Sequence, residues 1–250
     1  MSLLFRKHTR LLVVTIAALL AACTSMGTPP DYSAALASSS RMEGDQARDA
    51  GRKPAEVLAF LGVRPGMTVL DVMASGGWYT EVMAIAVGNT GKVYAQNPPA
   101  FLAFRNGFYD KAISARLADG RLPNVERLDA DFAAMNLDGT VDVAISALNF
   151  HDLYNRDPAA AAAMLSAVMQ ALRPGGVFGI IDHVGNPGAN NAALHRMLPQ
   201  QAMDAAMAAG FTVESSDLLA VSTDDHTKMV FAPDVQGQTD RFLLKLRKPG

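Results

Sequence analysis

The sequence predicts an α/β fold of the doubly wound type, in which a mostly parallel sheet carries helices on both faces. Three observations lead to this prediction. From about residue 55 onward, segments typical of strands alternate with segments typical of helices. Two of the expected strands, "MTVLDVM" and "VFGIID", are nearly continuous apolar runs, as in strands that are buried on both faces. Repeated alternation of this kind is the pattern of βαβ units stacked into one sheet.

The expected helices have recognisable ends. "PAEVLAFLG" and "WYTEVMAIAVG" each stop at a glycine, and residues 99–118 and 191–209 have helical patterns. The clearest helix is "DPAAAAAMLSAVMQALRPGG", with Asp157 as its N-cap, Pro158 at the first helical position and Gly175 past its end.

The last two strands differ from the others in their connection. The remaining strand segments are "KVYAQ", "VERLDA", "VDVAISAL", "FTVESSDLLA" and "RFLLKLRK". No long helix separates the final two, whereas a parallel pair needs a long crossover. We therefore expect an antiparallel strand near the edge of the sheet.

Residues 1–22 have the parts of a secretory signal peptide. Arg6, Lys7 and Arg10 form a basic start, and a short apolar stretch and small residues lead to Cys23, the chain's only cysteine. The ending "LAAC" resembles the lipobox of bacterial lipoproteins, in which the cysteine is acylated and becomes the new N-terminus. A buried apolar helix with an incidental cysteine is the alternative.

This interpretation divides the chain into three parts and sets its charge. Residues 23–40 are small and polar and predict a flexible tether, and residues 41–250 predict one domain. Removing the signal takes three of the 22 basic residues, so 19 remain against 24 acidic ones, a net charge of −5. This balance gives no basis for nucleic-acid binding. We expect an exported protein that faces the periplasm and touches a membrane only through its lipid.

Polar residues follow the strands where they end. The segments are "VLDVMASGG", "YAQN", "LDADF", "ALNFHDL" and "GIIDH", and ligands bind at the carboxyl ends of such strands. In this order, with "LGVRPGMTVLDV" and "ALRPGGVFGIIDH", the sequence resembles the class I S-adenosylmethionine-dependent methyltransferases. The stretches "ALHRM", "AGFTVESSDLL", "DDHTKMVF" and "TDRFLLKLRKP" are similar to a group of predicted, often exported, bacterial methyltransferases.

The resemblance covers residues 41–250 and has consequences for fold and activity. It implies a seven-stranded sheet with an antiparallel last strand. It also implies S-adenosylmethionine as the cofactor and methyl transfer to a small-molecule acceptor. It identifies neither the acceptor nor the oligomeric state.

The first strand end carries the expected methionine-binding loop. The resemblance implies that Asp71 orders the turn and faces the methionine part of the cofactor, and that Gly77 lets the next helix approach the strand. Gly76 precedes it, and Met73 and Ser75 stand where glycines usually allow close backbone approach. All five are expected to contact the cofactor.

The next strand ends supply the rest of the cofactor site. Asn97, preceded by Gln96, stands where the family has an acidic residue for the ribose hydroxyls, and an amide holds a diol less tightly than a carboxylate. Asp131 fits the position that meets the adenine amino group, with Asp129 as the alternative in a register shifted by two. Asn149 completes the expected set.

Candidate catalytic and substrate residues follow the fourth and fifth strands. His151 is the expected base, because an imidazole titrates near neutral pH, and Asp152 accompanies it. Alternatively His151 caps a helix or bonds a backbone group. His183 and Arg196 are the expected substrate contacts. No metal site is predicted, because adjacent strand residues such as Asp182 and His183 point to opposite faces.

Three classes of function are compatible with these patterns. The first is a methyltransferase. The second is a catalytically degenerate ligand-binding lipoprotein, since the methyl donor is made in the cytoplasm and three expected cofactor residues are replaced. The third is a structural envelope protein, which predicts a pocket filled by its own side chains.

Overall fold

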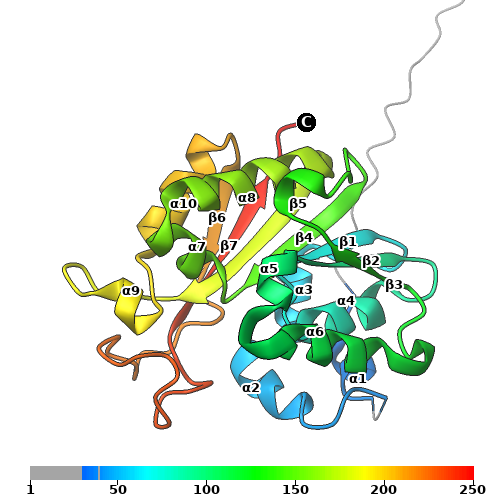
Figure 1. The fold of residues 1–250 in the computed structure, drawn as a ribbon, viewed down its shortest axis with the longest axis horizontal. Coiled ribbons are helices and arrows are strands. Elements are labelled where there is room, and N and C mark those ends of the chain that lie inside the picture. Colours follow the sequence, from blue (N-terminus) through cyan, green and yellow to red (C-terminus); the bar gives the residue numbers. More distant parts are fainter. Residues whose placement is uncertain (1–29, 39) are drawn as a thin grey trace, which may run out of the picture.

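A seven-stranded mixed sheet forms the centre of the computed structural model, which describes residues 30–38 and 40–250 (Figure 1). The strands are β1 (Thr68–Val72), β2 (Lys92–Asn97), β3 (Val125–Asp129), β4 (Val141–Ala147), β5 (Leu172–His183), β6 (Thr212–Ser216) and β7 (Arg241–Arg247). Their spatial order is β3-β2-β1-β4-β5-β7-β6. The first five pair in parallel, and β7 lies antiparallel between β5 and β6. This confirms the predicted class I methyltransferase fold.

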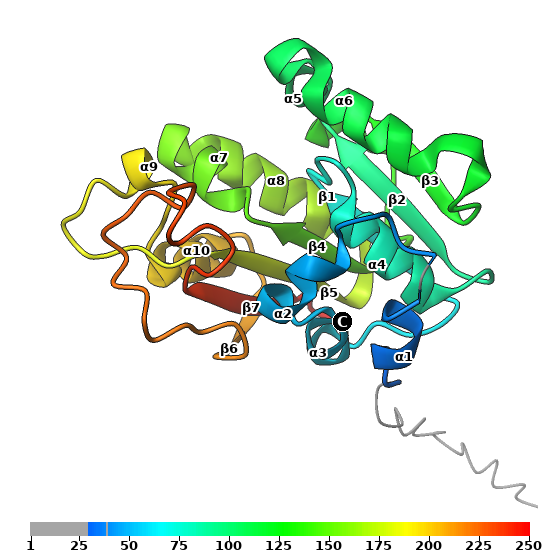
Figure 2. The ribbon, with the colours of Figure 1, turned by 90° about the horizontal axis from the view of Figure 1, so that it is seen from below.

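Helices cover both faces of the sheet (Figure 2). The α-helices are α1 (Ser33–Leu36), α2 (Asp49–Arg52), α3 (Pro54–Leu61), α4 (Trp78–Val87), α5 (Pro99–Leu102), α6 (Phe104–Leu117), α7 (Phe150–Arg156), α8 (Pro158–Ala171), α9 (Asn191–Leu194) and α10 (Pro199–Ala208). Three short 3₁₀ turns are η1 (Gln46–Arg48), η2 (Ala118–Gly120) and η3 (Phe132–Ala134). One core cluster joins the sheet to α7, α8 and α10, and a second joins it to α1, α3 and α4.

The position of β1 in the middle of the sheet explains why its sequence is apolar at successive positions. Leu70 and Val72 belong to the first core cluster, and Val69 belongs to the second. All three side chains are fully buried, as expected for a strand that is covered on both faces.

The predicted start of α8 is confirmed, but its end differs. The Asp157 side chain accepts a hydrogen bond from the Ala159 amide at 2.9 Å, and Pro158 is the first helical residue. The helix ends at Ala171 and the chain enters β5 at once, so Gly175 lies within the strand segment rather than directly after the helix.

The helices expected over residues 99–118 and 191–209 are each broken. Left-handed backbone at residues 105–107 interrupts the first. The second is interrupted at His195, with φ of 53°, and restarts at Pro199 as the first residue of α10. Proline has no amide hydrogen to donate to a preceding turn, so it begins a helix more readily than it continues one.

The domain begins earlier than expected. The Tyr32 hydroxyl donates to the Val63 carbonyl at 3.1 Å, and Leu36 is buried in the second core cluster. The tether predicted over residues 23–40 therefore gives way to packed structure by residue 32, because these two apolar side chains fit against the domain. The predicted signal peptide and Cys23 lie outside the described residues. Within the described part of the chain, no helix is long and apolar enough to span a bilayer.

Candidate functional site

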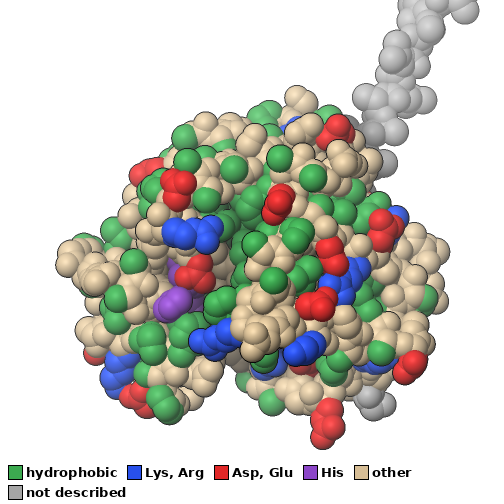
Figure 3. Space-filling model, viewed as in Figure 1, with side chains coloured by type: hydrophobic (Ala, Val, Ile, Leu, Met, Phe, Trp, Pro, Cys, Tyr) green, Lys and Arg blue, Asp and Glu red, His purple; other side chains and the backbone are tan. Residues whose placement is uncertain are grey.

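A cleft of about 1230 Å³ opens at the carboxyl ends of the parallel strands. Met73 at the end of β1 and Asp131 after β3 line it, together with residues of α5, α6, α7 and the segment after α9. Most of its wall is apolar or aromatic, with Phe101, Tyr109 and Phe132 among the lining side chains. Figure 3 shows apolar side chains gathered in the hollow, with acidic, basic and histidine side chains around it. Such a wall with a few polar groups is typical of a small-molecule site.

The loop between β1 and α4 has an unusual backbone. Met73 and Ser75, which occupy expected glycine positions, have φ of 53° and 55°. Residues that carry a side chain rarely adopt this left-handed backbone conformation, which costs about 1–2 kcal/mol per residue. The loop therefore keeps the shape of a glycine turn although two of its residues carry side chains.

Glycine is retained where α6 approaches the loop. Gly77 has φ of 79°, and a Cβ placed there would lie 2.5 Å from Ile113 Cδ1 and 2.8 Å from Arg116 Cδ. The neighbouring Gly76 carbonyl accepts a hydrogen bond from Arg116 Nε at 2.6 Å. These two glycines thus pack against α6.

Two buried carboxamides at the end of β2 hold this loop. Gln96 Oε1 accepts from the Met73 amide at 3.0 Å, and Gln96 Nε2 donates to the Ala130 carbonyl at 2.7 Å. Asn97 Oδ1 accepts from the Ser75 amide at 2.8 Å, and Asn97 Nδ2 donates to the Ser75 carbonyl at 3.4 Å. Asn97 was expected to meet a ribose diol, but its accepting oxygen is directed at the loop instead.

Asp71 lies behind the cleft, not in its wall. Its carboxylate accepts a hydrogen bond from Thr80 Oγ1 on α4 at 2.6 Å, and only 3% of the residue is exposed. Burial raises the pKa of Asp71 to about 7, although Thr80 and Arg116 act to lower it. The geometry agrees with ordering of the turn, and it gives Asp71 no contact with the cleft that would face a methionine group.

The other expected cofactor residues lie in different settings. Asp131 lines the cleft, whereas its alternative Asp129 pairs with Arg127 at 2.8 Å outside it. Asn149 Nδ2 donates to the Met73 carbonyl at 3.0 Å and so supports the loop. The structure therefore distinguishes the two aspartates by position.

His151 is fixed by a buried carboxylate at the end of β5. Asp182 accepts from the His151 backbone amide at 2.7 Å and lies 2.6 Å from His151 Nδ1. Burial lowers the pKa of His151, but the Asp182 and Asp152 carboxylates outweigh this effect and raise it to about 10. The ring is paired with a side-chain carboxylate, which differs from the expected alternative of a helix cap or a backbone contact, and the raised pKa favours its protonated form.

Asp152 connects His151 to a residue that the sequence patterns gave no role. Asp152 Oδ1 lies 3.1 Å from His151 Nε2 and 2.9 Å from His195 Nδ1. Asp152 and His195 also line the cleft. His195 was not expected here because one continuous helix was predicted over residues 191–209, whereas the chain breaks at His195 between α9 and α10.

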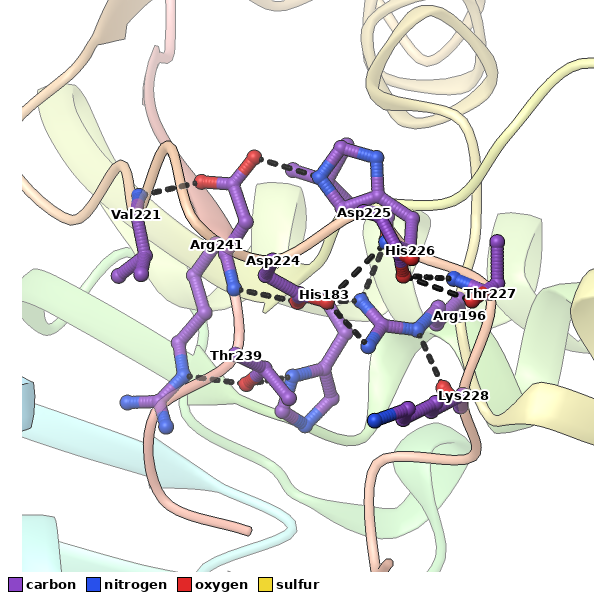
Figure 4. Close-up of polar contacts among 12 residues, drawn as sticks. His183, Arg196, Val221, Asp224, Asp225, His226, Thr227, Lys228, Thr239 and Arg241 are labelled. Atoms are coloured by element: carbon purple, nitrogen blue, oxygen red, sulfur yellow. Dashed lines mark hydrogen bonds and ion pairs between the residues drawn. The ribbon is translucent and has the colours of Figure 1, made fainter. Parts of the chain in front are cut away.

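The expected substrate residue Arg196 is fully buried in a polar network (Figure 4). Its guanidinium pairs with both carboxylate oxygens of Asp224, at 2.9 and 3.1 Å, and donates to the Lys228 carbonyl at 2.9 Å. Arg196 therefore holds the segment before β7 in place. It has no exposed surface through which it could bind an anionic substrate. This is a correction to the expected role.

His183 lies in the same network. Its Nδ1 is 2.7 Å from Thr239 Oγ1, and 6% of the residue is exposed (Figure 4). Burial, with the nearby Arg241 and His151 cations, holds the pKa of His183 well below its usual range. The lowered pKa favours the neutral ring, and His183 is not among the residues that line the cleft, so this geometry gives no direct substrate contact.

Comparison with known proteins supports the fold. No protein-family model matches the sequence, and no curated protein matches it. The chain is similar to a SAM-dependent methyltransferase from Aquifex aeolicus, with 23% identity, 81% of this chain and 95% of that chain covered, and a TM-score of 0.57. It is also similar to the [4+2]-cyclase SpnF, with 17% identity, 85% of each chain covered and a TM-score of 0.58. A possible exported protein from Bordetella parapertussis shares 16% identity, with 82% of this chain and 68% of that chain covered and a TM-score of 0.51. These similarities define a protein of class I methyltransferase fold.

Replacing Asn97 tests the carboxamide contacts. In Asn97→Ala the partly buried Ser75 amide loses its acceptor, so we expect a loss of about 1 kcal/mol in the free energy of unfolding. Chemical denaturation of the variant and of Asn89→Ala, at an exposed asparagine, measures the difference. Equal stability of the two variants would contradict the role given to Asn97.

The raised pKa of Asp71 predicts a pH dependence of stability. Between about pH 4 and pH 7 the folded protein retains a proton that the unfolded chain has released, so rising pH favours unfolding. A shift from 3.8 to about 7 corresponds to at most about 4 kcal/mol. Asp71→Asn should remove this decrease in the free energy of unfolding with rising pH. Asp138→Asn, at an exposed aspartate, should keep it. Denaturation at pH 4 to 8 measures both, and identical slopes in the two variants would exclude a raised pKa at Asp71.

Proposed function

We propose that this protein is an S-adenosylmethionine-dependent methyltransferase that acts on a small-molecule acceptor in the cleft beside Met73 and Asp131. The open cleft at the carboxyl ends of the parallel strands carries this proposal. Ligands bind at this position in doubly wound folds. The cleft is not filled by the protein's own side chains, which argues against a purely structural envelope protein.

The lining residues fit the adenosyl part of the cofactor. Asp131 offers a carboxylate to an adenine amino group, and Phe101 and Phe132 offer apolar surface for the base. Asn97 departs from the expected pattern, because its oxygen already accepts from Ser75. The ribose would therefore be held by fewer side-chain acceptors than the resemblance implies.

The residues at the rim of the cleft could position an acceptor. The bound cofactor supplies a methyl group on a positively charged sulfur, and the protein must align the acceptor with it. Asp152 lies between two imidazoles and borders the cleft, where its carboxylate can accept a proton from an acceptor. His151, held by Asp182, orients Asp152 instead of acting as the base itself.

A ligand-binding protein without methyl transfer is the second candidate function. The direct observation in its favour is that Asn97 is committed to the loop. The similarity to a [4+2]-cyclase is consistent with it, since one fold can serve several chemistries.

Cofactor binding and its dependence on Asp131 test the first proposal. Calorimetric titration of the purified protein with S-adenosylmethionine should give measurable binding. Asp131→Ala should weaken it about tenfold, which corresponds to about 1.4 kcal/mol. Asp129→Ala, two residues earlier at the end of β3, is a matched control and should bind as the unaltered protein does, because Asp129 lies outside the cleft wall.

Other outcomes would redirect the assignment. No heat at millimolar cofactor would contradict the methyltransferase proposal. Mass spectrometry of a ligand retained through purification would then identify what the cleft holds, and a compound without an adenosyl group would favour the second candidate.

We also propose that the protein is exported and anchored by a lipid on Cys23, facing the periplasm. The signal-like N-terminus supports this proposal, as does the similarity to a possible exported protein. The net charge of −5 after processing supports the absence of nucleic-acid partners.

The location predicts a simple fractionation result. In bacterial cells the unaltered protein should sediment with membranes and be extracted by detergent. Cys23→Ser should remain unacylated and, where the signal is still cleaved, appear in the soluble periplasmic fraction. Immunoblots of the fractions measure this, and membrane retention of the variant with its leader removed would contradict lipid anchoring.

A further inference from the structure

His151, Asp152 and His195 form a compact group at the rim of the cleft. One nitrogen from each imidazole and one oxygen from the carboxylate all lie within 4.8 Å of one another. The expectation of no metal site relied on the opposite directions of adjacent strand residues. That reasoning does not apply to His151 and Asp152, because both lie on helix α7.

One atom of this group is buried without a hydrogen-bond partner. His151 is 2% exposed, and its Nε2 has no hydrogen-bond acceptor or donor, although Asp152 Oδ1 lies 3.1 Å away. Buried polar atoms without partners are rare in folded proteins, because burial without a partner costs about 1–3 kcal/mol. A metal ion bound between Nε2 and Asp152 would replace the Nε2 proton and give this buried nitrogen a bonding partner.

The other side of the His151 ring is arranged as in many metal-binding histidines. Its Nδ1 lies 2.6 Å from Asp182 Oδ1, and Asp182 has no exposed surface. A carboxylate on one ring nitrogen fixes the ring and leaves the opposite nitrogen to the metal. Two carboxylates flanking one imidazole also make this position attractive to a cation.

His195 is held next to Asp152 by independent contacts. The carbonyl of the next residue, Arg196, accepts from Asn155 Nδ2 of α7 at 2.9 Å, which ties His195 to the helix that carries Asp152. The His195 ring also packs edge-on against Phe231, with ring centroids 5.0 Å apart. Its position therefore does not depend on the Asp152 contact alone.

We propose that His151, Asp152 and His195 bind a divalent transition-metal ion of the zinc class. Two imidazoles and one carboxylate favour such ions over Mg²⁺ or Ca²⁺, which prefer oxygen ligands. Metal–ligand bonds of about 2.0–2.1 Å in a tetrahedral site place neighbouring ligand atoms about 3.3 Å apart. The observed 3.1 and 2.9 Å separations need only small adjustments to reach this spacing.

Three protein ligands leave a fourth position open. Asp152 and His195 line the cleft, so this position faces the space where a small molecule would bind. A water molecule or a donor atom of that small molecule completes the coordination. Metal binding by these three residues does not depend on the proposed methyl transfer, but with the metal bound Asp152 is a ligand and no longer the proton acceptor proposed above; only the contact with an acceptor rests on the proposed function.

Direct metal titration tests the site without any cofactor. The full-length protein, purified in mild detergent and free of affinity tags, is stripped with chelator and titrated with Zn²⁺ by calorimetry. Elemental analysis after dialysis gives the stoichiometry. We expect one Zn²⁺ per chain with a Kd in the micromolar range or tighter, and no binding of Mg²⁺ at the same concentrations.

Variants separate this site from other histidines. His195→Ala, at a partly exposed residue, and Asp152→Asn should each weaken Zn²⁺ binding at least tenfold. His226→Ala is the control, because His226 also lies 2.8 Å from a carboxylate, that of Asp240, but among the described residues it belongs to no group of three ligands. It should leave the affinity unchanged, and circular dichroism should show that each variant is folded.

Several outcomes would overturn the proposal. These are fewer than half a Zn²⁺ per chain, unchanged affinity in folded His195→Ala, or an equal loss in His226→Ala. Replacement by Co²⁺ adds a spectroscopic measurement, since four-coordinate Co²⁺ bound here should absorb visible light, and Asp152→Asn should alter that spectrum. Because these experiments contain no S-adenosylmethionine, failure of metal binding and failure of the proposed methyl transfer are observed separately.

Discussion

The contact between two carboxamides and one loop fixes the place where the first strand end meets the cleft. Gln96 and Asn97 reach from the end of β2 to the Met73 and Ser75 amides and supply their acceptors, which matters most for the buried Met73 amide. These hydrogen bonds offset the cost of left-handed backbone at both loop residues. Asn149 holds the Met73 carbonyl from the other side. The loop is thus fixed between β2 and the end of β4, and Met73 enters the cleft at a defined place.

The fold was predictable because its signals are local. Apolar runs, glycine stops and the Asp157 cap each depend on a few neighbouring residues, and the absence of a long helix between the last two strands was sufficient to indicate the antiparallel β7. The helix breaks were harder to predict. Left-handed backbone at residues 105–107 interrupts a segment that is otherwise helical, and of these residues Arg105 is one that usually continues a helix.

The candidate site was predictable in part, for a different reason. Asp131 and Asp152 follow strands and line the cleft, as the strand-end rule implies. Asn97 also lies at a strand end, but it bonds the backbone amide of Ser75, 22 positions earlier. A contact of this kind cannot be predicted from the order of side chains in the sequence. His195 reaches Asp152 across 43 positions of sequence, through a break that propensity does not encode.

The early start of the domain, at Tyr32, sets the length of the connection to a membrane. If Cys23 carries a lipid as proposed, about nine residues separate it from the first packed side chain. Fully extended, they reach roughly 30 Å, comparable to the hydrocarbon thickness of a bilayer. The domain would then move over the membrane within a shallow layer instead of sampling the full depth of the compartment. Molecules that gather at the membrane surface would meet the cleft at a local concentration far above their average in solution.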